Sequence, residues 1–191
     1  DCYVNDAFGT AHRAHASTEA VAKILKPAVA GFLMQRELDY LGRALDQPQR
    51  PFVAILGGAK ISGKIDVIRA LLGKVDRVLI GGAMMFTFLR AQGRPTGRSL
   101  VEEDRVGMAR EVLDQASRSG VELVLPVDCV ASVAADGSAP WHNIRLEDLG
   151  AEEMGVDIGP DTVRSFSERI QDARTVLWNG PMGIFEVPAF A

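Results

Sequence analysis

The sequence predicts an α/β fold in which a parallel sheet is flanked by helices, a Rossmann-like arrangement of three αβα layers. Short apolar runs each lead directly into a glycine turn, at residues 52–58, 77–82 and 175–180. Stretches with the periodicity of a helix separate these runs. Strands that alternate with helices of about 10–15 residues are typical of βαβ units, which build parallel sheets.

The first 50 residues do not follow this alternation. Residues 2–4 resemble the end of a strand, and the chain starts within it without a Met, so we expect an internal segment of a longer protein. A helix is predicted over 32–45, because Met34, Leu38, Leu41 and Leu45 share one face. Prolines at 48 and 51 end this helix, and we expect a domain boundary at 46–51.

The following residues alternate as a βαβ protein should. Apolar residues at helical spacing predict a helix from 65 to 75. A shorter helix is predicted at 84–89, and a well-marked one over 102–119, with Gly120 at its end. Residues 121–127 predict a strand, residues 131–153 an irregular surface excursion, and residues 160–172 a helix. Val163, Phe166 and Ile170 are expected to face inward on that last helix.

Composition excludes several classes of protein. The chain has 191 residues, 47% of them hydrophobic, and its net charge of −4 with scattered basic residues does not favour nucleic-acid binding. Its two cysteines are far apart and there are only three histidines, so neither a redox motif nor a zinc site is indicated. No membrane span or signal peptide is visible, and we expect a cytoplasmic location.

The segment Gly57-Gly58-Ala59-Lys60 has the composition of a phosphate site. A strand that enters a helix through glycines offers free backbone N–H groups, and Lys60 and Lys64 add cations. The alternative is a tight βα turn with two solvated lysines. The segment also approaches the P-loop pattern, but Ile65 stands where that pattern needs a hydroxyl, and we treat the similarity as coincidental.

Three glycine turns at one edge of a parallel sheet indicate an elongated anionic ligand, with a nucleotide as the leading candidate. The dinucleotide pattern G-x-G-x-x-G is absent, which disfavours an oxidoreductase.

Other candidate residues have two interpretations each. Arg13 could clamp a carboxylate or phosphate, or form a surface salt bridge. Glu186 could accept hydrogen bonds from a ribose, or be merely solvated. Asp128 could serve function at a strand end, or cap a helix. Trp178 and Phe185 could form a stacking platform for a base, but we expect them in the core, and Cys129 is expected there as a small buried residue.

Five blocks of sequence, in order and with matching spacing, resemble those of the phosphoglycerate kinase family: residues 3–17, 31–34, 56–60, 155–160 and 178–186. The resemblance covers nearly the whole chain except 131–153. It implies a two-lobed, monomeric enzyme of glycolysis that transfers a phosphoryl group between 1,3-bisphosphoglycerate and ADP, giving 3-phosphoglycerate and ATP, with Mg²⁺. Residues 1–30 would then be a remnant of the substrate-binding N-terminal lobe, 31–50 the connecting helix and hinge, and 51–191 a truncated nucleotide-binding C-terminal lobe.

The resemblance also implies roles for individual residues. His12 and Arg13 would bind phosphoglycerate, and Lys60, Lys64 and Arg13 would be catalytic. The nucleotide would be bound by a larger set: Gly58, Ala59, Lys60 and Lys64 at its phosphates, Gly81, Gly82, Gly155 and Val156 at its adenine, and Asn179, Pro181 and Glu186 at its phosphate and ribose side.

The chain departs from the family pattern at three positions. Gly63 replaces a usual Asp near the metal, Ala83 replaces a third glycine, and Val156 replaces a Leu. The family's Mg²⁺-binding Asp belongs to a block expected beyond residue 191, so no metal ligand is expected within this segment. The second hypothesis is therefore a catalytically inactive fragment that still binds the nucleotide.

We predict that the 191-residue chain alone shows no measurable phosphoryl transfer, because the resemblance places most of the substrate lobe and the metal-binding Asp outside it. A coupled enzymatic assay on the purified chain checks this. Turnover above background would contradict the prediction.

Overall fold

The protein is described by a computed structural model over residues 1–190. The chain divides into two compact units, Asp1–Pro48 and Gln49–Ala191. Each unit is described by itself below.

The first unit contains a small parallel sheet and one long helix. The strands β1 (Tyr3–Asn5) and β2 (Ala28–Ala30) pair in parallel, and the short helices η1 (Phe8–Thr10), η2 (Ala16–Ala20) and α1 (Val21–Ile24) lie between them in sequence. The predicted helix is present as α2 (Phe32–Asp46). Its start is fixed by Asp6, whose Oδ1 accepts a hydrogen bond of 2.9 Å from the backbone N–H of Met34.

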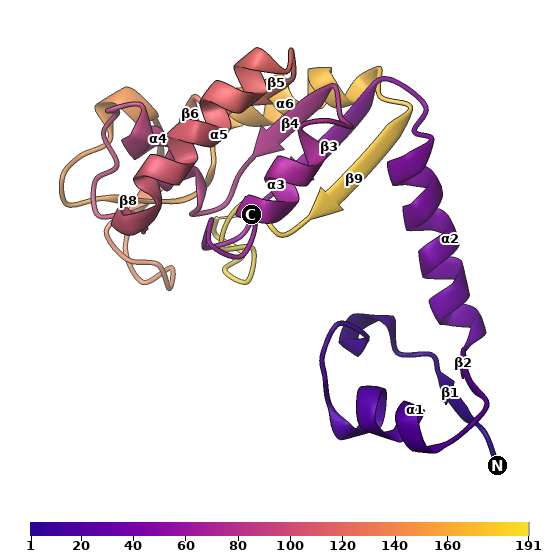
Figure 1. The fold of residues 1–191 in the computed structure, drawn as a ribbon. Helices are drawn as coiled ribbons and strands as arrows, with labels where there is room; N and C mark the ends of the chain where they lie inside the picture. The colour runs from indigo at the N-terminus through magenta and orange to yellow at the C-terminus, as the bar shows by residue number, and fades with distance from the viewer. Residues whose placement is uncertain (191) are drawn as a thin grey trace. The chain divides into compact units, whose positions relative to one another are not determined.

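The second unit is built on the predicted parallel sheet (Figure 1). Its strands are β3 (Phe52–Leu56), β4 (Arg77–Ile80), β5 (Glu122–Val124) and β9 (Thr175–Asn179), in the spatial order β5-β4-β3-β9. All neighbouring pairs are parallel, so the carboxyl ends of the strands share one edge. The strand predicted over 121–127 is shorter, because the chain leaves this sheet after Val124.

Helices cover both faces of this sheet, as the fold prediction required. The helices α3 (Ile65–Leu71) and α5 (Val106–Arg118), the latter preceded by η3 (Glu103–Arg105), lie on one side and α6 (Pro160–Gln171) on the other (Figure 1). Val53, Ile55 and Leu79 of the sheet form a buried cluster with Phe166 of α6. The expectation for Val163 is wrong, since its side chain is exposed.

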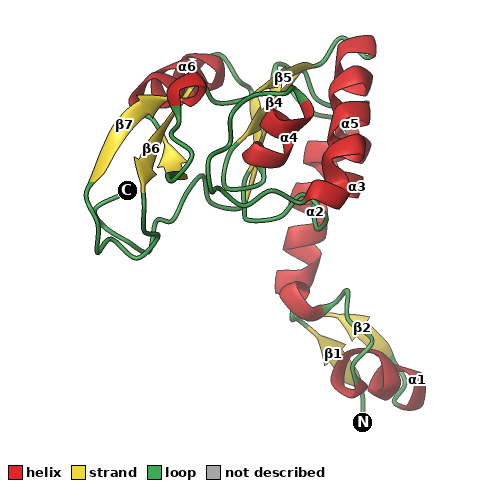
Figure 2. Ribbon diagram, turned by 90° about the vertical axis from the view of Figure 1, so that its left-hand side faces the viewer, coloured by secondary structure: helices red, strands yellow, loops and turns green. Residues whose placement is uncertain are grey.

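A second sheet, which the sequence analysis did not predict, lies beside the first (Figure 2). Its strands β7 (Trp141–Arg145), β6 (Asp128–Ser132) and β8 (Met154–Ile158) pair antiparallel in that order, and the short helix η4 (Leu146–Asp148) follows β7. The prediction of an irregular excursion over 131–153 is therefore wrong. Its strand β7 is mostly exposed and has only Trp141 and Ile144 as apolar residues, so it lacks the apolar alternation by which a strand is recognised in sequence.

Asp128 caps a helix. It is the first residue of β6, and its buried carboxylate accepts hydrogen bonds from the backbone N–H groups of Asp161 (2.9 Å) and Thr162 (2.8 Å). The Thr162 hydroxyl donates a third, of 2.6 Å. Of the two roles considered for Asp128, the capping role is the one its contacts show.

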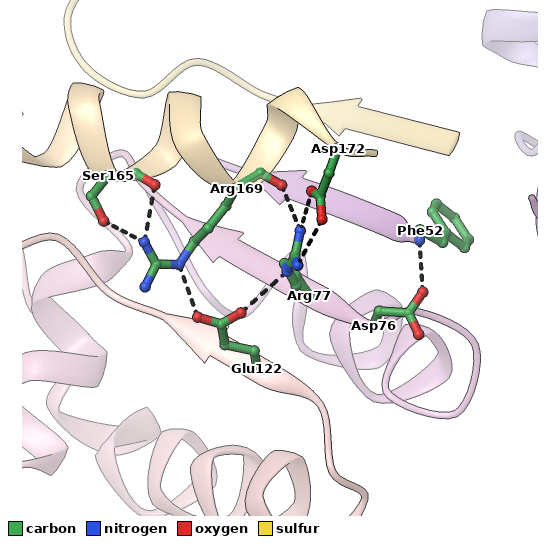
Figure 3. A network of polar contacts seen from close by, with 7 residues as sticks. All are labelled: Phe52, Asp76, Arg77, Glu122, Ser165, Arg169 and Asp172. Carbon is green, nitrogen blue, oxygen red and sulfur yellow. Dashed lines mark hydrogen bonds and ion pairs between the residues drawn. The ribbon is translucent and has the colours of Figure 1, made fainter. Parts of the chain in front are cut away.

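An ion-pair network joins α6 to the parallel sheet (Figure 3). It lies at the edge where the strands begin, opposite the edge formed by their carboxyl ends. Arg77 of β4 pairs with Asp172 (2.5 Å), at the end of α6, and with Glu122 (3.2 Å), the first residue of β5. Arg169 of α6 also pairs with Glu122, at 2.8 Å. The hydrogen bond and positive charge of Arg77 lower the pKa of the Asp172 carboxyl below its usual value. Helix α6 is thus fixed near both of its ends by carboxylates.

We predict that Asp128→Ala lowers the free energy of unfolding by about 1–3 kcal/mol, because two backbone N–H groups and a buried hydroxyl lose their acceptor. Urea-induced unfolding measures this change. The matched control is Asp161→Ala, whose carboxylate only reaches the exposed Arg164 at 3.0 Å and should change stability far less. Equal losses in the two variants would contradict the capping role.

Candidate functional site

The three glycine turns meet at the carboxyl edge of the parallel sheet, packed backbone against backbone. A Cβ added at Gly82 would lie 2.4 Å from the backbone nitrogen of Gly58, and one at Gly180 would lie 2.4 Å from the carbonyl oxygen of Gly57. A Cβ at Gly57 would lie 2.0 Å from the carbonyl oxygen of Pro181. No side chain fits at these contacts, so glycine is what allows the three turns to converge.

Backbone hydrogen bonds join the turns to one another. The N–H of Gly57 donates to the carbonyl of Asn179 (2.9 Å), and the N–H of Gly82 donates to that of Met182 (2.7 Å). The N–H of Ile184 donates to the carbonyl of Val156 in β8, at 2.8 Å. The chain after β9 is therefore held between the parallel sheet and the antiparallel one.

A pocket of about 230 Å³ opens between these turns, β8 and the helix α4 (Met85–Ala91). Its lining is mainly backbone and apolar side chain: Gly58, Ala59, Gly82, Ala83, Met85, Phe86, Gly155, Val156, Asp157, Pro181, Met182, Gly183, Ile184 and Glu186. A Cβ at Gly155 would lie 2.3 Å from the Phe86 ring, so glycine at 155 leaves that ring its place in the wall. Such a pocket suits a flat, largely apolar group that is fixed by a few polar contacts.

Two carboxylates belong to the lining, Asp157 and Glu186. Burial raises the pKa of Asp157 above its ordinary value, and the hydrogen bond of 2.7 Å that its Oδ1 accepts from the N–H of Ile158 opposes this shift only in part. The Asp157 carboxylate also lies against Gly183, where an added Cβ would lie 2.1 Å from its Cγ and 2.3 Å from its Oδ1. Asp157 therefore limits how closely the loop after β9 can approach β8.

Two lysines lie on the turn formed by residues 60–64, here called the lysine turn. Lys64 is the N-cap residue of α3, and its ammonium group contacts Oδ1 of Asn179, at the end of β9. Lys60 follows the pocket residue Ala59 and is exposed. Both cations thus lie at the edge of the sheet where the pocket opens, which favours an anionic group there.

The structure brings together most of the residues predicted for the nucleotide. Those that line the pocket are Gly58, Ala59, Gly82, Gly155, Val156, Pro181 and Glu186. Lys60, Lys64, Gly81 and Asn179 lie on the same turns without lining it, and Gly81 packs against Met182. His12 and Arg13 belong to the first unit, where both are exposed.

Sequence reasoning missed the apolar walls of the pocket and Asp157. Met85 and Phe86 come from the first turn of α4, directly after a glycine turn, and that position could have suggested them. Met182 and Ile184 lie within the block 178–186 but were given no role, and they line the pocket because the loop after β9 contacts β8.

Two aromatic residues predicted in the core are exposed. Trp178 is 63% exposed and Phe185 is 59% exposed. Trp178 lies on β9, an edge strand of the described sheet, and its indole N–H donates to the carbonyl of Gly180 at 2.8 Å. Cys129, in contrast, is buried as expected, and burial with the nearby charge of Asp128 raises the pKa of its thiol to about 12. A thiol with this pKa is no nucleophile at neutral pH.

Metal ligands do not gather in the described part of the chain. Within residues 1–190 no three His, Cys, Asp or Glu side chains are placed to hold one ion together. A Cβ at Gly63, where the family pattern has Asp, would meet no other atom within 4 Å. Among the same residues, no helix has both the length and the apolar character needed to cross a membrane.

Comparison with known proteins agrees with this geometry. The family model described as phosphoglycerate kinase matches residues 1–191. Among curated relatives, the phosphoglycerate kinase of Chlorobium luteolum is 58% identical over the whole chain, which covers 48% of that protein. The chloroplastic phosphoglycerate kinase of Volvox carteri is 54% identical, and the chain covers 41% of it.

Solved structures give the same result. Phosphoglycerate kinase from Coxiella burnetii superimposes with a TM-score of 0.89 at 41% identity, over all of this chain and 49% of that one. The enzyme from Pyrococcus horikoshii superimposes with a TM-score of 0.87 at 35% identity, over all of this chain and 48% of that one. The chain spans about half the length of the curated relatives it matches. The family model, the relatives and the fold together show that this chain belongs to the phosphoglycerate kinase family.

Proposed function

We propose that the chain supplies the nucleotide-binding part of a phosphoglycerate kinase. The reaction is the reversible transfer of a phosphoryl group between 1,3-bisphosphoglycerate and ADP, which gives 3-phosphoglycerate and ATP. The observation that carries the proposal is the apolar pocket at the carboxyl edge of the parallel sheet, with two lysines on an adjoining turn. A nucleotide needs this combination, because it joins a flat base to a highly charged phosphate chain.

The proposed orientation follows from the chemistry of the lining. The base lies between Phe86 and Val156, two apolar residues of the lining. The ribose hydroxyls donate hydrogen bonds to the Glu186 carboxylate. The phosphates extend toward the lysine turn, where the ammonium groups of Lys60 and Lys64 neutralise their charge.

The lysines act in transfer by positioning and by electrostatic stabilisation. The transferred group carries its charge on its equatorial oxygens, so a cation held beside them lowers the barrier without any covalent step. Lys64 is oriented by Asn179, and Lys60 is exposed on the same turn. We assign no nucleophile, and the high pKa of Cys129 argues against its use as one.

The remaining assignments are proposals based on the family. Residues 1–30 would belong to the lobe that binds phosphoglycerate through His12 and Arg13, residues 31–50 to the connecting helix and hinge, and residues 51–191 to the nucleotide lobe. The family's Mg²⁺ would accompany the nucleotide, and no cluster of three His, Cys, Asp or Glu side chains within the described residues is placed to hold it. We propose a monomeric, cytoplasmic enzyme, although the Volvox relative is named as chloroplastic.

The second candidate is a nucleotide-binding chain without catalysis. It is favoured by one observation: Gly63 stands where the family pattern has an Asp near the metal. ADP binding without turnover, in the full-length protein that carries this chain, would support it.

We predict that Lys60→Ala in the full-length enzyme lowers kcat about 10²–10³-fold, because the charge of the transferred group loses a cation (~2.7–4 kcal/mol). Arg13→Ala should mainly raise KM for 3-phosphoglycerate, with a smaller loss in kcat, because it is proposed to grip a group that does not react. Steady-state kinetics on both variants separate the two roles. If Lys60→Ala left kcat within a factor of about three of the parent, Lys60 would be a solvated bystander.

We predict that Glu186→Ala weakens ADP binding by only about 0.5–1.5 kcal/mol, the worth of one hydrogen bond to a ribose hydroxyl. Isothermal titration calorimetry with ADP measures this loss, and 2′,3′-dideoxy-ADP, which lacks both hydroxyls, serves as control. The analogue should bind the parent and the variant equally. A loss that persists with the analogue would remove the ribose from the assignment.

A further inference from the structure

A carboxylate from a distant segment holds the lysine turn. The backbone N–H of Ser62, between the two lysines, donates a hydrogen bond of 3.1 Å to Oε2 of Glu102. Glu102 lies forty residues further along the chain, immediately before η3. This residue does not line the pocket and has no role in the nucleotide contacts proposed above.

Glu102 is itself fixed to the wall of the pocket. Its backbone N–H donates a hydrogen bond of 3.1 Å to the hydroxyl of Thr87, which is fully buried in α4. The same helix contributes Met85 and Phe86 to the pocket. Glu102 therefore connects the helix that lines the base pocket to the turn that carries the lysines.

The electrostatics of Glu102 agree with this connection. Burial alone would raise the pKa of the carboxyl, but hydrogen bonds from Ser62 and Ile61 and the nearby positive charge of Lys60 outweigh it, and the pKa lies below its usual value. At neutral pH the group is thus an anion beside the lysine turn, where it orients N–H groups and attracts the Lys60 ammonium.

The turn has local contacts of its own besides the one to Glu102. Ile61 is fully buried, and its carbonyl accepts hydrogen bonds from the N–H groups of Lys64 (2.8 Å) and Ile65 (2.9 Å), which close the turn locally. What Glu102 adds is a fixed direction for the backbone at Ser62, between the lysines. Its effect should therefore appear in the geometry of the cations more than in global stability.

We propose that Glu102 is a positioning residue for phosphoryl transfer. It holds the turn that carries Lys60 and Lys64 at a fixed position relative to α4, and so relative to a nucleotide whose base is bound against α4. This inference rests on the proposed function and adds to it a residue that touches neither substrate. Small errors in the position of a catalytic group can cost about 10²-fold in rate, so a tether of this kind has a measurable consequence.

The test uses the full-length enzyme with Glu102→Ala, Glu102→Gln and the control Glu103→Ala. Glu103 is the next residue, its side chain is 69% exposed, and it reaches only Arg90 at 3.4 Å. We expect Glu102→Ala to lower kcat about 10- to 100-fold and to weaken ADP binding. The affinity for adenosine, which has the base and ribose but no phosphate, should stay at the parent value. Glu102→Gln keeps an oxygen that can accept from Ser62 and should recover most of the rate, and Glu103→Ala should match the parent.

Several results would overturn the positioning role. One is a kcat for Glu102→Ala equal to that of Glu103→Ala. Another is a parallel loss of adenosine affinity, or a loss of rate that follows the fraction of unfolded protein in a thermal melt, since both would indicate a merely structural role. A Glu102→Gln variant as slow as Glu102→Ala would exclude the hydrogen bond as the tether. A different result would contradict the proposed function itself: a parent enzyme that neither binds ADP nor transfers a phosphoryl group.

Discussion

The packing of three glycine turns against one another is the constraint on which the rest of the candidate site depends. Gly58, Gly82 and Gly180 all have positive φ, and two of them approach the backbone of a neighbouring turn where no Cβ could stand. Because the strands β3, β4 and β9 are parallel, these turns arise at one edge of the sheet. Their convergence brings backbone N–H groups, a pocket and two lysines into one region. A side chain at Gly82 or Gly180 would push the turns apart and disturb all three features.

Both sheets of the second unit contribute residues to the pocket. The parallel sheet supplies the glycine turns, while β8 of the antiparallel sheet supplies Gly155, Val156 and Asp157. Helix α6 connects them, because Asp128 of β6 caps its start and the Arg77 network holds its end against the parallel sheet. Phe190 and Val130 then pack against Val156, which supports β8 from the side of the C-terminal segment. The position of the pocket wall therefore depends on contacts well outside the pocket.

Charge is arranged around the pocket and largely kept out of its walls. The lining is apolar apart from Asp157 and Glu186, and the lysines lie on an adjoining turn. Asp157 is a poorly solvated carboxyl group, and its raised pKa means that its ionised form is less stable in the folded protein than in the unfolded chain. The contribution of this group to the free energy of unfolding should therefore be largest at acid pH and fall as the pH rises through 3.8, the ordinary pKa of the group, because the folded protein then has to hold a buried charge. A destabilising group of this kind is a common feature of ligand sites. Glu102 has the opposite environment, since nearby N–H groups and a lysine favour its charged form.

The sequence by itself determined the parallel sheet, most of its strand and helix bounds, and the family. The sheet and its elements depend on local patterns of apolar runs, helical periodicity and glycine at turns, whereas the family depends on the five blocks of sequence that resemble it. The sequence also indicated Gly58, Gly82, Gly155, Val156, Pro181 and Glu186, which the structure gathers around one pocket. Tertiary structure alone decided the antiparallel sheet, because the mostly exposed strand β7 is stabilised by pairing with β6 and has no pattern of its own. It likewise decided the exposure of Trp178 and the roles of Asp128 and Glu102. Asp128 contacts Thr162, 34 positions away, and Glu102 contacts Ser62, 40 positions away. No local pattern encodes a contact between segments that only folding brings together.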